Sequence, residues 1–161
     1  MTAWPEPVTR VATFLREAGA EARLEEFSVP TPTARDAAKA AGCDLAQIVK
    51  SLVLQCDGKP VLVLVPGDRR ADPAKVARAT GSAKASVAGP EVVEAATGFP
   101  PGGVAPFPAP NVDRVLIERT LLAHDVVWVG AGSDRHMAGL SPAELVRLTR
   151  AVALDVVQAG T

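Results

Sequence analysis

The chain has 161 residues, of which 48% are hydrophobic and 22% charged, which predicts one globular domain spanning residues 1–161. The net charge of −1 excludes a strongly basic protein that coats duplex nucleic acid, but it leaves binding to one end of a nucleic acid open. With aromatic residues at 4% and no tyrosine, a surface that recognises bases by stacking is not expected.

The N-terminal residues and the two cysteines indicate a soluble protein of the cytoplasm. Residues 1–7 lack the basic and apolar segments of a secretory signal, and the longest apolar run, residues 61–65, is too short to cross a bilayer. Cys43 and Cys56 have no histidine near them in sequence, so they match neither a disulfide framework nor a zinc site. We therefore expect no metal, no cofactor and no membrane partner.

Proline, glycine and apolar periodicity divide the first half of the chain into short elements. A helical pattern that begins near Val8 ends at Gly19, and a weak strand follows over residues 23–29. Thr33 is predicted to cap a helix over residues 34–41. The clearest β signal is a hairpin of two apolar strands, residues 48–54 and 60–65, around the turn residues Asp57 and Gly58.

The second half continues the alternation of helices and strands. The pattern predicts helices from Pro73 to Gly81, over residues 90–96 and from Ser141 onward, and strands over residues 112–118 and 125–129. It also predicts a loop at residues 99–110, a glycine-rich loop at 130–139, and a strand or continued helix at 152–157. These elements predict a mixed α/β domain with a strongly curved, partly closed sheet surrounded by helices.

Lys50 is the most distinctive residue, because it interrupts a predicted strand whose other residues are mostly apolar, as in a buried strand. An unpaired ammonium is costly to bury, so this side chain must reach solvent, pair, or face a polar cavity. A lysine that protects a sheet edge from aggregation explains the pattern equally well. As a site residue, it would hold a phosphate or polarise a carbonyl.

Two glycine-containing segments are further candidates. Gly102 and Gly103 are surrounded by prolines, so backbone amides in this segment would be rigidly held and open to a ligand. The Gly-Ala-Gly-Ser sequence at residues 130–133 directly follows an apolar strand, where ligands often meet the backbone. Each segment taken alone favours a surface turn, since neither has the spacing of a phosphate-binding or dinucleotide-binding loop.

Charge is distributed unevenly, and catalytic triads have no signature here. Residues 35–84 carry nine basic and five acidic residues, against eight basic and thirteen acidic elsewhere. This asymmetry predicts a positive face for an anionic partner, with Arg69, Arg70, Lys75 and Lys84 around the pocket, or merely a solvated surface. The chain has only two histidines, and neither lies in a recognisable triad motif.

Four blocks in order resemble the YbaK/EbsC family of aminoacyl-tRNA deacylases, which are relatives of the editing domain inserted in bacterial prolyl-tRNA synthetases. They are QIVKSL at residues 47–52, LVPGDRR at 64–70, TGFPPGGVAPF at 97–107, and VWVGAGS at 127–133 followed by LSP at 140–142. The resemblance implies the curved α/β fold of the family and hydrolysis of the ester that joins a wrong amino acid to the terminal adenosine of a tRNA.

The resemblance also implies which residues act. The implied catalytic group is Lys50, Gly102, Gly103, Val104, Ala105 and Pro106. The implied substrate-binding group is Thr31, Ser51, Gly130, Gly132, Ser133 and His136. Lys50 would anchor the terminal adenosine, the loop amides would orient the carbonyl, and the ribose hydroxyl of the substrate would activate water.

The expected substrate is tRNA-Pro carrying a small wrong amino acid such as cysteine or alanine. Many members that edit tRNA-Pro carry Asn after the lysine, where this chain has Ser51, so the amino acid removed stays open. The expected partners are the acceptor end of the mischarged tRNA and, beyond it, prolyl-tRNA synthetase or a second copy of this chain. A non-catalytic tRNA- or nucleotide-binding module, a small-molecule hydrolase and a regulatory protein are the alternatives.

Overall fold

The computed structural model describes residues 4–160, and its helices follow the proline and glycine signals of the sequence. Side chains of Thr33, Asp72 and Ser141 accept hydrogen bonds from backbone amides at the start of three of them, and the two others have proline at their first or second position. The helices are α1 (Glu6–Glu17), α2 (Ala34–Ala41), α3 (Pro73–Thr80), α4 (Pro90–Thr97) and α5 (Pro142–Thr149), with short 3-10 turns η1 (Leu45–Gln47) and η2 (Arg119–Ala123).

The larger sheet is built around the predicted hairpin. Strands β2 (Val49–Cys56) and β3 (Lys59–Pro66) pair antiparallel across the Asp57-Gly58 turn. Strand β3 also pairs in parallel with β5 (Arg114–Glu118), β5 pairs in parallel with β8 (Val152–Leu154), and the short β4 (Ala85–Val87) pairs with the far end of β2. The resulting order is β4-β2-β3-β5-β8, in which β3 is central and buried along most of its length.

The smaller sheet corrects one expectation from the sequence. Residues 130–139 were expected to form a loop, but β6 (Val127–Ser133) and β7 (His136–Leu140) form a hairpin there, and β7 also pairs with β1 (Ala22–Glu26). The glycines misled the prediction because they permit close backbone approach inside the hairpin, whose pairing register shifts between Gly130 and Ser133.

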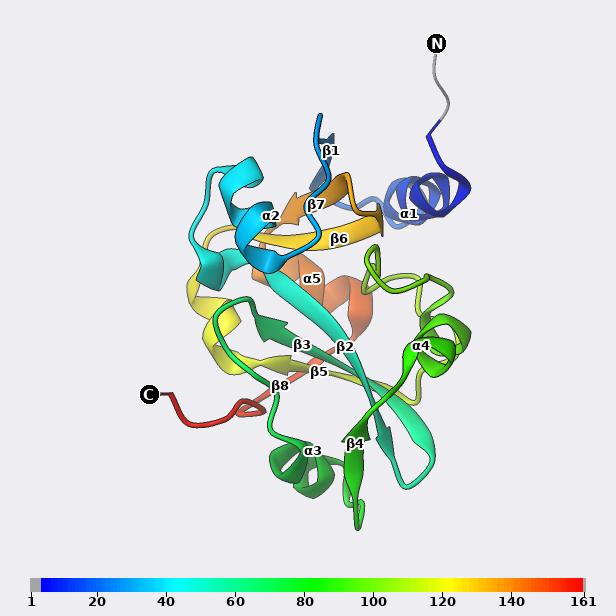
Figure 1. Cartoon of the computed structure of the whole chain (residues 1–161), viewed down its shortest axis with the longest axis vertical. Coiled ribbons are helices and arrows are strands. Elements are labelled where there is room, and N and C mark those ends of the chain that lie inside the picture. The colour runs from blue at the N-terminus through cyan, green and yellow to red at the C-terminus, as the bar shows by residue number, and fades with distance from the viewer. Residues whose placement is uncertain (1–3, 161) are drawn as a thin grey trace.

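The two sheets meet at one corner, and this corner positions the candidate site. An isolated bridge joins Ile48, just before β2, to Trp128 of β6. Figure 1 shows β6 and β7 above the start of β2, with α2 at the same end of the molecule. The mixed α/β fold is confirmed, and its strands form two open sheets joined at this corner. Within residues 4–160, no helix combines the length and apolarity needed to cross a membrane.

Candidate active site

A cavity of about 330 Å³ lies where the start of β2, the start of α2, the glycine loop after α4 and the β6–β7 hairpin converge. Segments that are far apart in sequence therefore build one site. Most of the predicted residues line it: Thr31, Lys50, Ser51, Gly102, Gly103, Val104, Gly130, Ser133 and His136. Ala105, Pro106 and Gly132 do not line this cavity.

Those three residues support the wall from behind. Ala105 is fully buried in the main apolar core. Pro106 lines a different cavity, beside Phe14 and Phe107. Gly132 lies against the backbone of Pro7, where a side chain would collide with the start of α1. We therefore assign them no direct contact with a ligand in this cavity.

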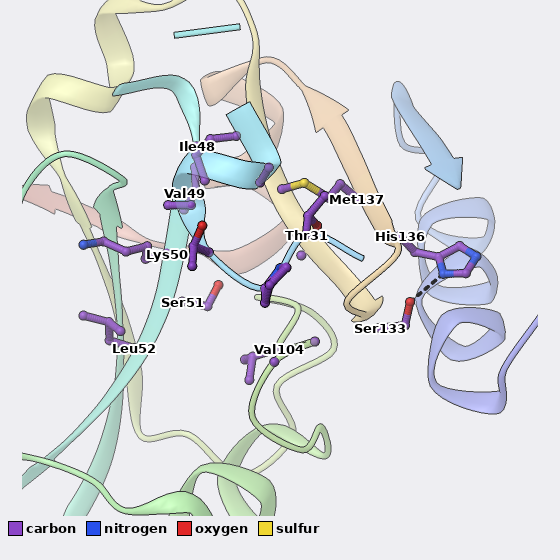
Figure 2. A pocket seen from close by; sticks show the side chains of 17 residues that line it. Thr31, Ile48, Val49, Lys50, Ser51, Leu52, Val104, Ser133, His136 and Met137 are labelled. Carbon is purple, nitrogen blue, oxygen red and sulfur yellow. Dashed lines mark hydrogen bonds between the residues drawn. The ribbon is translucent and has the colours of Figure 1, made fainter. Parts of the chain in front are cut away.

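Lys50 and Ser51 are neighbours on β2, so their side chains leave opposite faces of the strand. Figure 2 shows Lys50 extending away from Ser133 and His136, while Ser51 lies on the other side of β2, the side on which Val104 is drawn. The Lys50 Nζ donates a 2.6 Å hydrogen bond to the carbonyl oxygen of Arg69, in the loop that follows β3. The ammonium therefore points away from the interior of the cavity and towards the loop after β3, and we call Lys50 with residues 67–72 the lysine rim.

The surroundings of Lys50 disfavour its protonated form. Partial burial lowers the pKa of the ammonium, the positive charge of Arg70 lowers it further, and the carboxylate of Asp68 acts in the opposite direction. An ammonium has three donors, and the Arg69 carbonyl occupies one of them. The other two donors can meet an anion at the rim, and binding of that anion would relieve the repulsion from Arg70.

Ser51 carries an unused polar group inside the site. Its Oγ is buried and has no hydrogen-bond partner among residues 4–160. A buried hydroxyl without a partner costs about 1–3 kcal/mol, so it usually has a ligand or functional reason. The position is consistent with the substrate-binding role predicted for Ser51, because the hydroxyl lies on the cavity side of β2 (Figure 2).

The opposite wall is made by two glycine segments packed backbone to backbone. The amide of Gly132 donates to the carbonyl of Gly103 at 2.9 Å. A Cβ on Gly103 would come within 2.7 Å of the Ser133 nitrogen, and a Cβ on Gly130 would come within 2.5 Å of the Val104 oxygen. Only glycine allows this approach, so the two segments, residues 102–105 and 130–133, form what we call the glycine seam.

The glycine seam leaves backbone donors unused. Among the described residues, the amide N–H groups of Val104 and Ala105 donate no hydrogen bond to another residue. Val104 lines the cavity, and Ala105 is buried directly behind it. Rigid, unsatisfied amides beside a small cavity can stabilise a carbonyl oxygen that gains negative charge, as in an oxyanion hole.

The imidazole of His136 lies between the side chains of Ser133 and Glu26, and Glu26 was not predicted from the sequence. Its Nδ1 lies 2.6 Å from Ser133 Oγ, and its Nε2 lies 3.0 Å from a carboxylate oxygen of Glu26. The contact between His136 Nε2 and Glu26 does not have the geometry of a hydrogen bond. Figure 2 shows the imidazole ring extending away from Ser51 and Thr31. Glu26 faces His136 because β1 pairs with β7 in that register, which no local motif reveals.

The positive face predicted around the pocket is only partly assembled. Arg69 and Arg70 lie in the lysine rim beside Lys50, but the Lys75 ammonium is bound to the carboxylate of Asp155. Lys84 precedes β4, which pairs with the Cys56 end of β2, roughly 20 Å of strand away from Lys50. The expectation is therefore wrong for Lys84, because the sheet carries it to the other end of the hairpin.

The available chemistry is binding, orientation and charge stabilisation. Within residues 4–160, no three histidine, cysteine or acidic side chains gather as a metal site would require. The cavity is instead lined by Lys50, by the buried hydroxyl of Ser51 and by Val104, whose amide donates to no other described residue. An ester that is already activated needs this kind of positioning more than it needs a strong base.

The sequence is similar to aminoacyl-tRNA editing domains and to proteins related to them. Residues 28–148 match the family described as the aminoacyl-tRNA editing domain. A proline–tRNA ligase from Nitratidesulfovibrio vulgaris (strain DP4) is 37% identical over 132 residues, which cover 79% of this chain, and this chain spans only 22% of that ligase. An uncharacterised Bacillus subtilis protein, YwhH, is 32% identical over 84% of this chain and 86% of its own length.

The fold comparison agrees with the sequence comparison. A solved structure described as a candidate trans-editing enzyme for prolyl-tRNA synthetase superposes with a TM-score of 0.90 at 33% identity. The superposition covers 98% of this chain and 100% of the other. The match over residues 28–148 includes every residue that lines the cavity, and the chain therefore belongs to the aminoacyl-tRNA editing domain family.

Proposed function

We propose that this protein hydrolyses the ester bond of mischarged tRNA in trans, in the cytoplasm, acting on tRNA-Pro that carries alanine or cysteine. The observation that carries the proposal is that Lys50 and the glycine seam line the same cavity in a chain of the editing family. Its volume of about 330 Å³ suits a small aminoacyl group with part of the terminal ribose. The proline–tRNA ligase relatives and the trans-editing structure support tRNA-Pro as the substrate.

In this proposal, Lys50 binds a phosphate of the substrate, and the glycine seam stabilises the negative charge that develops on the ester carbonyl. The ammonium at the rim contacts the phosphate of the terminal adenosine, which leaves the aminoacyl group to enter the cavity. The amide of Val104, which lines the cavity, donates a hydrogen bond to the carbonyl oxygen as that oxygen gains negative charge when water attacks. The neighbouring ribose hydroxyl of the substrate relays a proton: it accepts the proton that the attacking water loses and passes its own to the departing ester oxygen. The bond between that oxygen and the carbonyl carbon breaks, which gives a ribose hydroxyl and the free amino acid.

A deacylation assay with purified protein tests the proposal. Alanyl- and cysteinyl-tRNA-Pro should lose their amino acid faster than in buffer alone, whereas correctly charged prolyl-tRNA-Pro should be retained. A 2′-deoxy terminal adenosine that carries the amino acid on its 3′ oxygen should resist cleavage. Binding of the charged tRNAs without turnover would instead support a non-catalytic tRNA-binding module built on the same pocket.

A further inference from the structure

The loop that receives the Lys50 ammonium is itself tied to the C-terminal residues. Residues 155–158, which we call the C-terminal strap, run beside the segment between β3 and α3 (Figure 1, red beside green). Ala71 and Val157 form an antiparallel bridge, and the amide of Asp72 donates to the carbonyl of Val156 at 2.8 Å. The strap therefore pairs with the loop almost as an additional strand would.

Gln158 makes the contacts nearest to Lys50. Its amide donates to the carbonyl of Arg70 at 2.8 Å, and its carbonyl accepts from the Arg69 guanidinium at 2.7 Å. Its side-chain amide adds a 3.2 Å bond to the carbonyl of Ala71. The Arg69 carbonyl, which receives the Lys50 Nζ, thus lies between two contacts with the strap, one through the Arg69 side chain and one through the Arg70 carbonyl.

Two anchors fix the strap to the body of the protein. Lys75 of α3 binds both carboxylate oxygens of Asp155, at 3.0 and 2.9 Å, and the carbonyl of Val157 at 2.7 Å. The buried carboxylate of Glu118 accepts a 3.1 Å bond from the amide of Val156. Val156 and Val157 are themselves buried in the second apolar cluster, so the strap is a fixed part of the fold.

We propose that the C-terminal strap is a positioning element for Lys50, with Gln158 as its key residue, and this inference rests on the proposed function. By fixing the Arg69 carbonyl, the strap holds the ammonium at the rim with two donors free for the phosphate of the substrate. Without the strap, the loop would move, and Lys50 would spend most of its time as a mobile, solvated side chain. The loss would weaken binding of the tRNA end, because a flexible lysine must be ordered when the substrate arrives.

A matched pair of substitutions at Gln158 isolates this effect without a change of charge. Gln158→Pro removes the amide that donates to Arg70 and pushes the strap away from the loop, whereas Gln158→Ala keeps both backbone contacts. The first readout needs no substrate: the titration of the Lys50 side chain, followed by NMR of its ¹³Cε. We expect the pKa of Lys50 to rise towards the ordinary lysine value in Gln158→Pro and to stay near that of the unsubstituted protein in Gln158→Ala.

The second readout is deacylation. Gln158→Pro should raise KM roughly fivefold with kcat nearly unchanged, the size expected from one weakened hydrogen bond. In a Lys50→Ala background, the same substitution should have no further effect. An unchanged Lys50 titration in folded Gln158→Pro, or a KM effect that persists without Lys50, overturns the inference. If Gln158→Pro does not fold, Lys75→Met loosens the same strap from α3 and is judged by the same titration.

The two proposals fail in different ways. If the unsubstituted protein shows no deacylation, the proposed function fails, while the NMR titration still decides whether the strap positions Lys50. If deacylation occurs but the Lys50 titration ignores the strap, only the positioning inference fails.

Discussion

Lys50 of the lysine rim and the glycine seam both line the cavity, yet the rim and the seam are built on opposite principles. The rim is held by side chains: Lys50 reaches the Arg69 carbonyl, and Arg69 in turn reaches Gln158. The seam is held by the absence of side chains, since Gly103 and Gly130 let two backbones touch. Side chains of the lysine rim can therefore be substituted with little damage to the fold, whereas a side chain added to a glycine of the seam disrupts the packing of the two backbones.

The largest expected effect is on the seam. Gly130→Ala would place a Cβ 2.5 Å from the Val104 oxygen, which forces the two segments apart. We expect the free energy of unfolding to fall by about 1–3 kcal/mol and deacylation to be lost. Gly89→Ala is the matched control, because its Cβ meets nothing within 4 Å, and it should leave activity intact. Thermal unfolding and deacylation rates of both variants check this, and an active, stable Gly130→Ala protein would show that the seam is not required.

The next effect is on the rim alone. Lys50→Ala should lower deacylation on the order of 100-fold, while the thermal unfolding midpoint stays close to that of the unsubstituted protein, because the ammonium is only partly buried. Lys50→Arg should also be poor, since a planar guanidinium does not fit the position of a compact ammonium. Lys59→Ala, an exposed lysine at the start of β3, is the control. Full activity in Lys50→Ala would remove Lys50 from the site.

Ser51 lies between the two walls and should separate stability from activity. Removing a buried hydroxyl that has no partner should raise the free energy of unfolding by up to about 1 kcal/mol, so Ser51→Ala is expected to be more stable. If the hydroxyl binds the substrate, kcat/KM should fall roughly tenfold in the same variant. Chemical denaturation and deacylation kinetics measure the two quantities. A variant with lower stability would mean that the hydroxyl has a structural partner instead.

The smallest expected effect is a pH dependence carried by the rim and absent from the seam. Burial and the charge of Arg70 lower the pKa of Lys50, and the charge of Asp68 acts in the opposite direction. The ammonium therefore loses its proton at a lower pH than an ordinary lysine does. Affinity for a tRNA with a non-hydrolysable amide-linked amino acid should therefore decline as pH rises through that lowered pKa. The decline should be absent in Lys50→Gln, which can be measured by binding titrations across the alkaline range. An identical decline in both proteins would assign it to another group.

The two walls also differ in how far the sequence predicts them. The β2–β3 hairpin and the caps of α2 and α3 were predictable, because turn and capping residues act locally. Lys50 was recognisable because a charge in an apolar strand is a local anomaly. The β6–β7 hairpin was not, since its glycines favour a loop until the facing backbone is known. Glu26, the short strand β4 and the strap at Gln158 depend on pairing between distant segments, which periodicity does not encode.

The pairing of β1 with β7 has a consequence for how the protein acquires its cavity. Residues 22–26 are synthesised early, but they can pair into a sheet only after residues 136–140 have been synthesised. The β2–β3 hairpin, by contrast, can form as soon as both of its strands are available. Long-range pairing of this kind is slow and comes late in folding. A nascent chain that already exposes Lys50 would still lack the far wall, so a ribosome-bound fragment should have no cavity. Competence for the substrate would then mark the last stage of folding.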